Sequence, residues 1–101
     1  MSAGQEFSLS LFLKIDSGTW NTKEVRDSHP VEKTEGRVNF SKKFTSLPTV
    51  IVSLSSLEIL QGCRVNVYAT HICLEGFTIH ADSWYDTELF TCGVSWLAIG
   101  Q

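Results

Sequence analysis

The sequence predicts an all-β fold, a small antiparallel β-sandwich, and three observations predict it. Several segments alternate polar with apolar residues, the period of two that half-buried strands show. Turn residues separate these segments at intervals of roughly 8–12 residues, as in known sandwiches. No segment carries a helical pattern longer than one turn. The 101 residues are sufficient for one domain with one hydrophobic core.

The first third of the chain predicts one strand, one turn and one long loop. Residues 1–6 are small and polar, and we expect them to be loose. Every odd position from Phe7 to Ile15 is apolar, which predicts a strand, and Asp16-Ser17-Gly18 predicts a turn after it. The segment from Trp20 to Gly36 is charged and poor in aliphatic residues, so we expect a long loop that Trp20 pins to the domain. Long loops of this kind are often functional.

The remaining strands follow in close succession. Arg37 to Phe40 predicts a second strand that ends at Phe44. Thr49 to Ile59 has a continuous apolar head and then alternates, so we predict a central strand. Its β-branched residues and serines disfavour a helix. The last three predicted strands are Arg64–Thr70, Phe77–Asp82 and Val94–Ile99, with a hinge at Ser83–Thr87 between the last two.

Composition excludes several classes of protein. The net charge is −3 and the basic residues are scattered, so the chain lacks the basic face of a nucleic-acid-binding protein. No apolar run approaches the ~20 residues that span a bilayer. The segment from Phe7 to Ile15 is interrupted by Lys14, and neither a basic start nor a cleavage pattern accompanies it, so it does not predict a signal peptide. We expect a cytoplasmic chain, unconventional export, or a leader that this sequence lacks.

The cysteines and histidines do not predict a metal site. Three cysteines, Cys63, Cys73 and Cys92, form no C-x-x-C motif, and we interpret them as free thiols of a reducing compartment. The alternative is that one of them pairs with another chain. Together with His71 and His80, these cysteines are residue types that can bind a metal ion. The spacing of the five residues matches no common zinc pattern.

The sequence also lacks the motifs of nucleophilic catalysis. It contains no G-x-S-x-G and no cysteine with a local activating motif. Three carboxylates, Asp82, Asp86 and Glu88, cluster around Trp84-Tyr85. They allow general acid–base chemistry, but Asp86-Thr87 fits equally well as a turn that caps its own backbone. We therefore expect no enzyme.

A sugar site is the remaining hypothesis. Such a site needs a carboxylate that accepts from hydroxyls, a donor such as arginine, and an aromatic surface for the C–H face of the sugar. Asp27, Arg64, Trp84 and Tyr85 supply these residue types.

A family resemblance supports this hypothesis. The motifs that carry it are, in order, Lys14-Ile15-Asp16-Ser17-Gly18, Trp20, Arg26-Asp27, Val38-Asn39-Phe40, Phe44, Pro48-Thr49-Val50, Arg64-Val65, Gly76-Phe77, Ser83-Trp84-Tyr85-Asp86-Thr87 and Val94-Ser95-Trp96. No single motif is specific, but the ordered set resembles the H-type lectins of the snail agglutinin and discoidin C-terminal type. The resemblance covers nearly the whole chain from about Lys14 onward.

The resemblance implies a β-sandwich that assembles as a trimer, often doubled to a hexamer. It implies binding of galactose and N-acetylgalactosamine without catalysis, metal or cofactor, at clefts between neighbouring protomers. Agglutination or adhesion at cell surfaces would follow, so the resemblance implies an extracellular or cell-surface location. The alternative hypothesis is a β-sandwich adhesion or assembly module that recognises protein and has no sugar specificity.

The resemblance also assigns site residues. The family's loop aspartate, which accepts from sugar hydroxyls, corresponds to Asp27, and its arginine corresponds to Arg64. Its tryptophan corresponds to Trp84, and the next position, histidine in the snail agglutinin, is Tyr85. A tyrosine further along corresponds to Phe90, where one hydroxyl contact is lost.

Two departures from the family accompany these assignments. The segment from Phe7 to Leu13 is more apolar than the first segment of the family, so we expect it either to pack differently or to extend a contact between subunits. The cysteines do not match the disulfide-forming cysteines of the snail agglutinin, so the resemblance implies no disulfide-linked hexamer.

Overall fold

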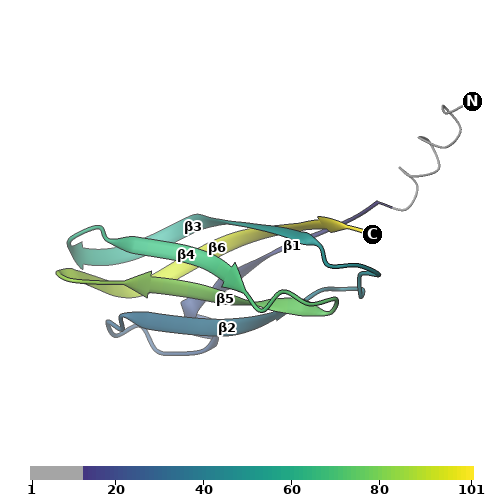
Figure 1. The fold of residues 1–101 in the computed structure, drawn as a ribbon. Coiled ribbons are helices and arrows are strands. Elements are labelled where there is room, and N and C mark those ends of the chain that lie inside the picture. Colours follow the sequence, from purple (N-terminus) through teal and green to yellow (C-terminus); the bar gives the residue numbers. More distant parts are fainter. Residues whose placement is uncertain (1–12) are drawn as a thin grey trace, which may run out of the picture.

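Two three-stranded antiparallel sheets form the domain in the computed structural model, which describes residues 13–101 (Figure 1). Sheet A has the strand order β1 (Lys14–Asn21), β6 (Thr87–Gly100) and β3 (Thr49–Gln61). Sheet B has the order β2 (Lys33–Asn39), β5 (Gly76–Ser83) and β4 (Val65–Thr70). A short 3-10 helix, η1 (Thr22–Glu24), follows β1. The sequence-based prediction of an antiparallel β-sandwich is confirmed.

The core lies between the two sheets and follows the period of two. On β5, Phe77, Ile79 and Ala81 are fully buried, and the residues between them face solvent. The long strand β6 contributes the opposite wall, and the rings of Phe77 and Trp96 meet edge to face at 5.5 Å. Burial of these apolar and aromatic side chains is the main force that holds the sheets together.

The predicted turn at Asp16-Ser17-Gly18 is wrong, because these residues lie inside β1. Asp16 accepts from the neighbouring amide of Ser17 and from the amide of Ser41 (2.9 and 2.8 Å), so its carboxylate fastens the loop after β2 to β1. Gly18 lies under the indole of Trp96, where a Cβ would come within 2.9 Å of the ring. Asp16 and Gly18 are residue types common in turns, but here they lie in a strand and make contacts with Ser41 and Trp96.

The predicted long loop is shorter than expected. The segment from Trp20 to Gly36 includes the end of β1, η1 and the start of β2, which begins at Lys33 instead of Arg37. A Cβ on Gly36 would lie 2.7 Å from Nε1 of Trp20. Trp20 therefore packs β1 against β2, and residues 25–32 alone form the loop.

The strand at Thr49–Gln61 is also not central, because β6 occupies the middle of sheet A and β3 lies at its edge. Val50 and Val52 pack against the core, whereas Ile51 points outward and is 53% exposed. The predicted first strand falls mostly outside the described residues: of Phe7 to Ile15, only the last three are described, and Lys14 starts β1. No helix among residues 13–101 is long and apolar enough to cross a membrane.

The outer faces of the two sheets differ in charge. Cross-strand rows on the outside of sheet B are charged or polar: Lys33, Asp82 and Asn66; Glu35, His80 and Tyr68; Arg37, Thr78 and Thr70. The corresponding rows on sheet A carry no charge: Ile15, Ile99 and Thr49; Ser17, Leu97 and Ile51; Thr19, Ser95 and Ser53. A solvated antiparallel sheet normally has a polar outer face, so sheet A is the unusual one.

Candidate functional site

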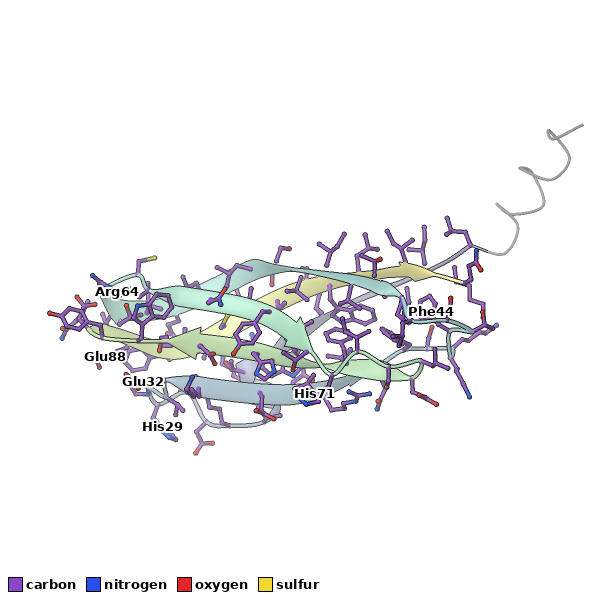
Figure 2. All side chains as sticks on the ribbon, in the orientation of Figure 1. His29, Glu32, Phe44, Arg64, His71 and Glu88 are labelled. Atoms are coloured by element: carbon purple, nitrogen blue, oxygen red, sulfur yellow. The ribbon has the colours of Figure 1, made fainter. Side chains whose placement is uncertain are left out.

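Three connecting segments meet at one end of the sandwich: loop 25–32, turn 62–64 and turn 84–86. The amide of Ser83 donates to the carbonyl of Glu32 (2.8 Å), and the amide of Val31 donates to the carbonyl of Leu89 (3.4 Å). Figure 2 shows His29, Glu32, Arg64 and Glu88 at this end and Phe44 at the other. The fold thus brings together segments that lie more than 50 positions apart in the chain.

Arg64 is held at the surface by contacts with turn 84–86. Its Nη1 donates to Oδ1 of Asp86 at 2.8 Å, and its Cζ lies 5.0 Å from the centre of the Tyr85 ring. Its backbone amide donates to Oγ1 of Thr87 at 2.8 Å, which ties the two turns together. The side chain remains 45% exposed, so a fixed cation faces solvent beside an aromatic ring.

The backbone of turn 84–86 supports this arrangement. Tyr85 has a φ of 62°, and the amide of Thr87 donates to the carbonyl of Trp84 at 3.3 Å. The left-handed region is costly for an aromatic residue, and such strain is common at functional sites. Trp84 and Tyr85 are 48% and 81% exposed, so both rings are open to a ligand.

Gly62 makes room for Asp86. A Cβ at position 62 would lie 2.1 Å from Oδ1 of Asp86 and 2.6 Å from Oγ1 of Thr87. Any side chain larger than glycine would therefore displace the carboxylate that holds Arg64. The contact between the two turns depends on this close approach.

Local sequence explains how loop 25–32 starts. The Asn21 side chain accepts from the amide of Lys23 (2.9 Å), and the Glu24 carboxylate accepts from the amide of Asn21 (3.1 Å). This is a capping box, and its N-x-x-E signature is visible in the sequence. The buried Thr22 accepts from the amide of Cys92 (3.0 Å), which joins η1 to β6.

Arg26 then fixes the path of the loop. Its Nη1 donates to the carbonyls of Asp27, His29 and Phe90 (2.7, 2.8 and 3.1 Å). Its Nη2 donates to the carbonyl of Leu89 (3.1 Å), and its Nε donates to Oγ1 of Thr34 (2.6 Å). Burial lowers the pKa of the guanidinium, although arginine stays protonated at neutral pH. The half-buried guanidinium of Arg26 therefore holds the loop against β6.

The structure places the predicted site residues in two groups at this end. Arg64 and Tyr85 are in contact, and Trp84 belongs to the same turn. Asp27 is exposed and Phe90 is half-buried, and Arg26 binds the carbonyls of both. Among the residues that the structure describes, no hydrogen bond or ion pair joins the two groups within one chain.

The three carboxylates near Trp84-Tyr85 have separate partners. Asp86 binds Arg64, and Glu88 accepts from Nε2 of Gln61 (3.2 Å). Asp82 lies on the outer face of sheet B, where it accepts from the hydroxyl of Tyr68 (2.6 Å). That hydrogen bond raises the pKa of the Tyr68 phenol. The role of Asp86 as a partner of Arg64 is the feature that sequence reasoning missed.

Other candidate sites lie elsewhere. No group of three or more histidine, cysteine or acidic side chains within the described range is placed to hold a metal ion. A pocket of about 250 Å³ lies where β1 meets the loop after β2, and its lining includes Lys14, Asp16, Ser41 and Phe44. Phe44 marks the end opposite to Arg64 (Figure 2), so this pocket is separate from the predicted site.

The three thiols, all in the described part of the chain, form no disulfide with one another. Cys73 is half-buried and accepts from Nη2 of Arg37 (2.9 Å). A hydrogen bond from the backbone of Glu75 lowers the pKa of the Cys73 thiol, and Arg37 adds to this effect against desolvation. Burial raises the pKa of Cys92 to about 11.

We expect iodoacetamide to alkylate Cys73 well before Cys92 at pH 7.5, because the thiolate is the nucleophile and a lower pKa increases its population. Burial further protects Cys92. Tandem mass spectrometry of peptides cleaved after Glu75 and Glu88 separates the two cysteines. Equal rates of labelling would contradict the assignment. An Arg37→Ala variant should slow the reaction of Cys73 alone.

Solved structures share this sandwich. Discoidin II of Dictyostelium discoideum superimposes with a TM-score of 0.73 at 15% identity, over 86% of this chain and 36% of that chain. The R1 pyocin fibre of P. aeruginosa gives a TM-score of 0.63 at 18% identity, over 88% of this chain and 23% of that chain. These similarities define the class of protein by fold, an all-β domain of the discoidin II type.

The sequence comparison defines the family. The model of the H-type lectin domain matches residues 35–99, which is more than half of the chain, so the chain belongs to the H-type lectin domain family. The match includes Arg64, Trp84, Tyr85 and Phe90, whereas Asp27 precedes it. A protein of Fuscovulum blasticum described as "ATP synthase subunits region ORF 7" is 35% identical over 66 residues, 63% of this chain. The aligned region spans 57% of that relative.

Proposed function

We propose that this domain is a non-enzymatic lectin that binds galactose or N-acetylgalactosamine on cell-surface glycans. The observation that carries the proposal is the Arg64 guanidinium, held at an open surface between Asp86 and the ring of Tyr85. Membership of the H-type lectin domain family supports it. The site lies at the end of the sandwich where the three connecting segments meet.

Each proposed residue supplies a different part of sugar recognition. Arg64 donates to the axial 4-hydroxyl or the ring region, and Asp27 accepts from adjacent hydroxyls. The exposed rings of Trp84 and Tyr85 face the weakly apolar C–H surface of the sugar. Phe90 has no hydroxyl and contributes only an apolar side chain.

A single site of this kind is weak, so multivalency is part of the proposal. A shallow monosaccharide site has an affinity between about millimolar and high micromolar, roughly −4 to −6 kcal/mol. Display of several sites on one assembly raises avidity by about 10²–10⁴ on a glycan-coated surface. No hydrogen bond or ion pair joins Asp27 to Arg64 within the described chain, which fits a site completed by a neighbouring copy.

The uncharged rows on the outer face of sheet A support assembly of the chain with its own copies, which we propose to be a trimer. Leu13, Ile15 and Ile51, which lie in these rows or directly beside them, are each at least 53% exposed. Figure 2 shows apolar side chains that project from the outer side of sheet A. Copies of the chain that pack through this face would bury these apolar side chains. Removal of apolar surface from water is favourable, so this burial would stabilise the assembly.

Replacement of Ile51 by lysine is expected to break the assembly into monomers, because it buries a charge at the centre of the apolar face. Sedimentation analysis measures the mass, and red-cell agglutination should be lost with it. Asn66→Lys is the matched control, since Asn66 lies on the outer face of sheet B and should leave the mass unchanged. A wild-type chain that sediments as a monomer would contradict the proposed trimer.

Retention on galactose-agarose, with elution by free galactose, tests the proposed function. We expect retention of the wild-type chain, and a parallel column of N-acetylgalactosamine-agarose ranks the two sugars. A chain that passes both columns and a glycan array without binding would overturn the lectin proposal. The alternative hypothesis, a β-sandwich module that recognises protein, would then replace it.

A further inference from the structure

We propose that Asp86 determines the specificity of the site, because it neutralises Arg64 and so selects neutral sugars over acidic ones. This inference rests on the proposed lectin function and names the residue that sets its ligand class. Asp86 is a positioning residue in this role, since it acts on the ligand through the guanidinium of Arg64.

The geometry leaves Arg64 with some donors free and its charge paired. Oδ1 of Asp86 accepts from Nη1 at 2.8 Å, and Cζ of Arg64 lies over the Tyr85 ring, 5.0 Å from its centre. In residues 13–101, Nε and Nη2 of Arg64 make no hydrogen bond, so both can donate to a ligand. Asp86 is also the one acidic residue in that range within ion-pair distance of Arg64.

The backbone of turns 62–64 and 84–86 positions Arg64 and Asp86 to form their ion pair. Gly62 lacks the Cβ that would collide with Oδ1 of Asp86, and the Thr87 hydroxyl binds the amide of Arg64. Tyr85 adopts the left-handed conformation at the position just before Asp86. Both members of the pair are more than 40% exposed, and pairs of this kind contribute little to stability. Its elaborate support is better explained by ligand recognition.

The charge of the pair decides which ligands bind. An unpaired arginine at an open surface favours carboxylates and sulfates, which match its planar fork of donors. With Asp86 in place, an acidic sugar that approaches Nε and Nη2 of Arg64 meets a second carboxylate a few ångströms away and is repelled by it. A neutral sugar hydroxyl accepts from Nε or Nη2 without that repulsion. The pair therefore discriminates by charge at the point where the ligand is held.

Asp86→Asn tests the inference, since asparagine keeps the shape and removes the charge. Titrations with galactose and with galacturonic acid, followed by NMR, measure both affinities. The two ligands share the axial 4-hydroxyl and differ by a carboxylate. We expect the variant to weaken galactose binding roughly threefold to tenfold and to strengthen galacturonic acid binding by about the same factor. Asp86→Glu, which keeps the charge, should retain the preference for galactose.

Glu88→Gln is the matched control, because it removes the same charge nearby and touches Gln61 instead of Arg64. An unchanged ratio of the two affinities in Asp86→Asn would overturn the inference, as would an equal change in Glu88→Gln. The wild-type titration separates this failure from that of the proposed function. If wild-type binds neither sugar, both proposals fail; if it binds galactose and the ratio does not move, only the role of Asp86 fails.

Discussion

Replacement of Arg64 by alanine is expected to abolish galactose binding and red-cell agglutination while the fold and the assembly persist. A hydrogen bond from a charged donor contributes about 1.5–3 kcal/mol, so its loss weakens binding by about 10–150-fold. That loss moves a site of about millimolar affinity beyond measurement. The side chain is 45% exposed and Asp86 remains solvated without it, so thermal stability should change by less than about 1 kcal/mol. Galactose titration and thermal unfolding measure the two effects.

Arg37→Ala is the matched control for Arg64→Ala. Arg37 is also an exposed arginine, but it lies on β2 and binds Cys73 and the carbonyl of His71. The control variant should bind galactose as wild-type does, which separates a local effect from the loss of one positive charge. If Arg64→Ala still agglutinates red cells and galactose still inhibits it, the site lies elsewhere.

Segments whose pattern reflects a single buried face were predictable from the sequence. The alternation at Phe77–Asp82 predicted β5 within a residue at each end, because each inward side chain meets the core and each outward one meets water. Gly18 and Ile51 misled the prediction for a physical reason. Gly18 lies in a strand because the Trp96 indole packs over it, and Ile51 is apolar on an uncovered face instead of in a central strand.

The site could be predicted only in part. Arg64, Trp84 and Tyr85 could be selected from the sequence by their residue types and by the order of the motifs. The structure brings Arg64 and Tyr85 into contact. The pairing of Arg64 with Asp86 joins two turns that are 22 positions apart, so no local pattern encodes it. The structure shows that the pairing needs a glycine at position 62, because a Cβ there would collide with Asp86. The sequence does not reveal this requirement, because it does not show that the two turns are neighbours.

The second large effect is expected from Arg26→Ala, which should lower both stability and galactose binding. The guanidinium donates five hydrogen bonds that hold loop 25–32 against β2 and β6. Its removal leaves the partly buried carbonyls of Leu89 and Phe90 without this donor, at a cost of about 3 kcal/mol. For a domain of this size that corresponds to a melting temperature lower by roughly 10–20 °C. Thermal unfolding by circular dichroism measures it.

Comparison with Asp27→Asn distinguishes the scaffold of the loop from its proposed contact with the sugar. The Asp27 side chain is exposed, whereas its carbonyl accepts from Arg26, and the amide variant keeps that carbonyl. Asp27→Asn should therefore weaken galactose binding strongly and leave the melting temperature unchanged. Arg26→Ala changes both quantities because the loop carries Asp27 in a position that Arg26 sets. An Asp27→Asn variant that titrates with galactose as wild-type does would move the acceptor to another residue of the loop, and the effect of Arg26 on stability would still stand.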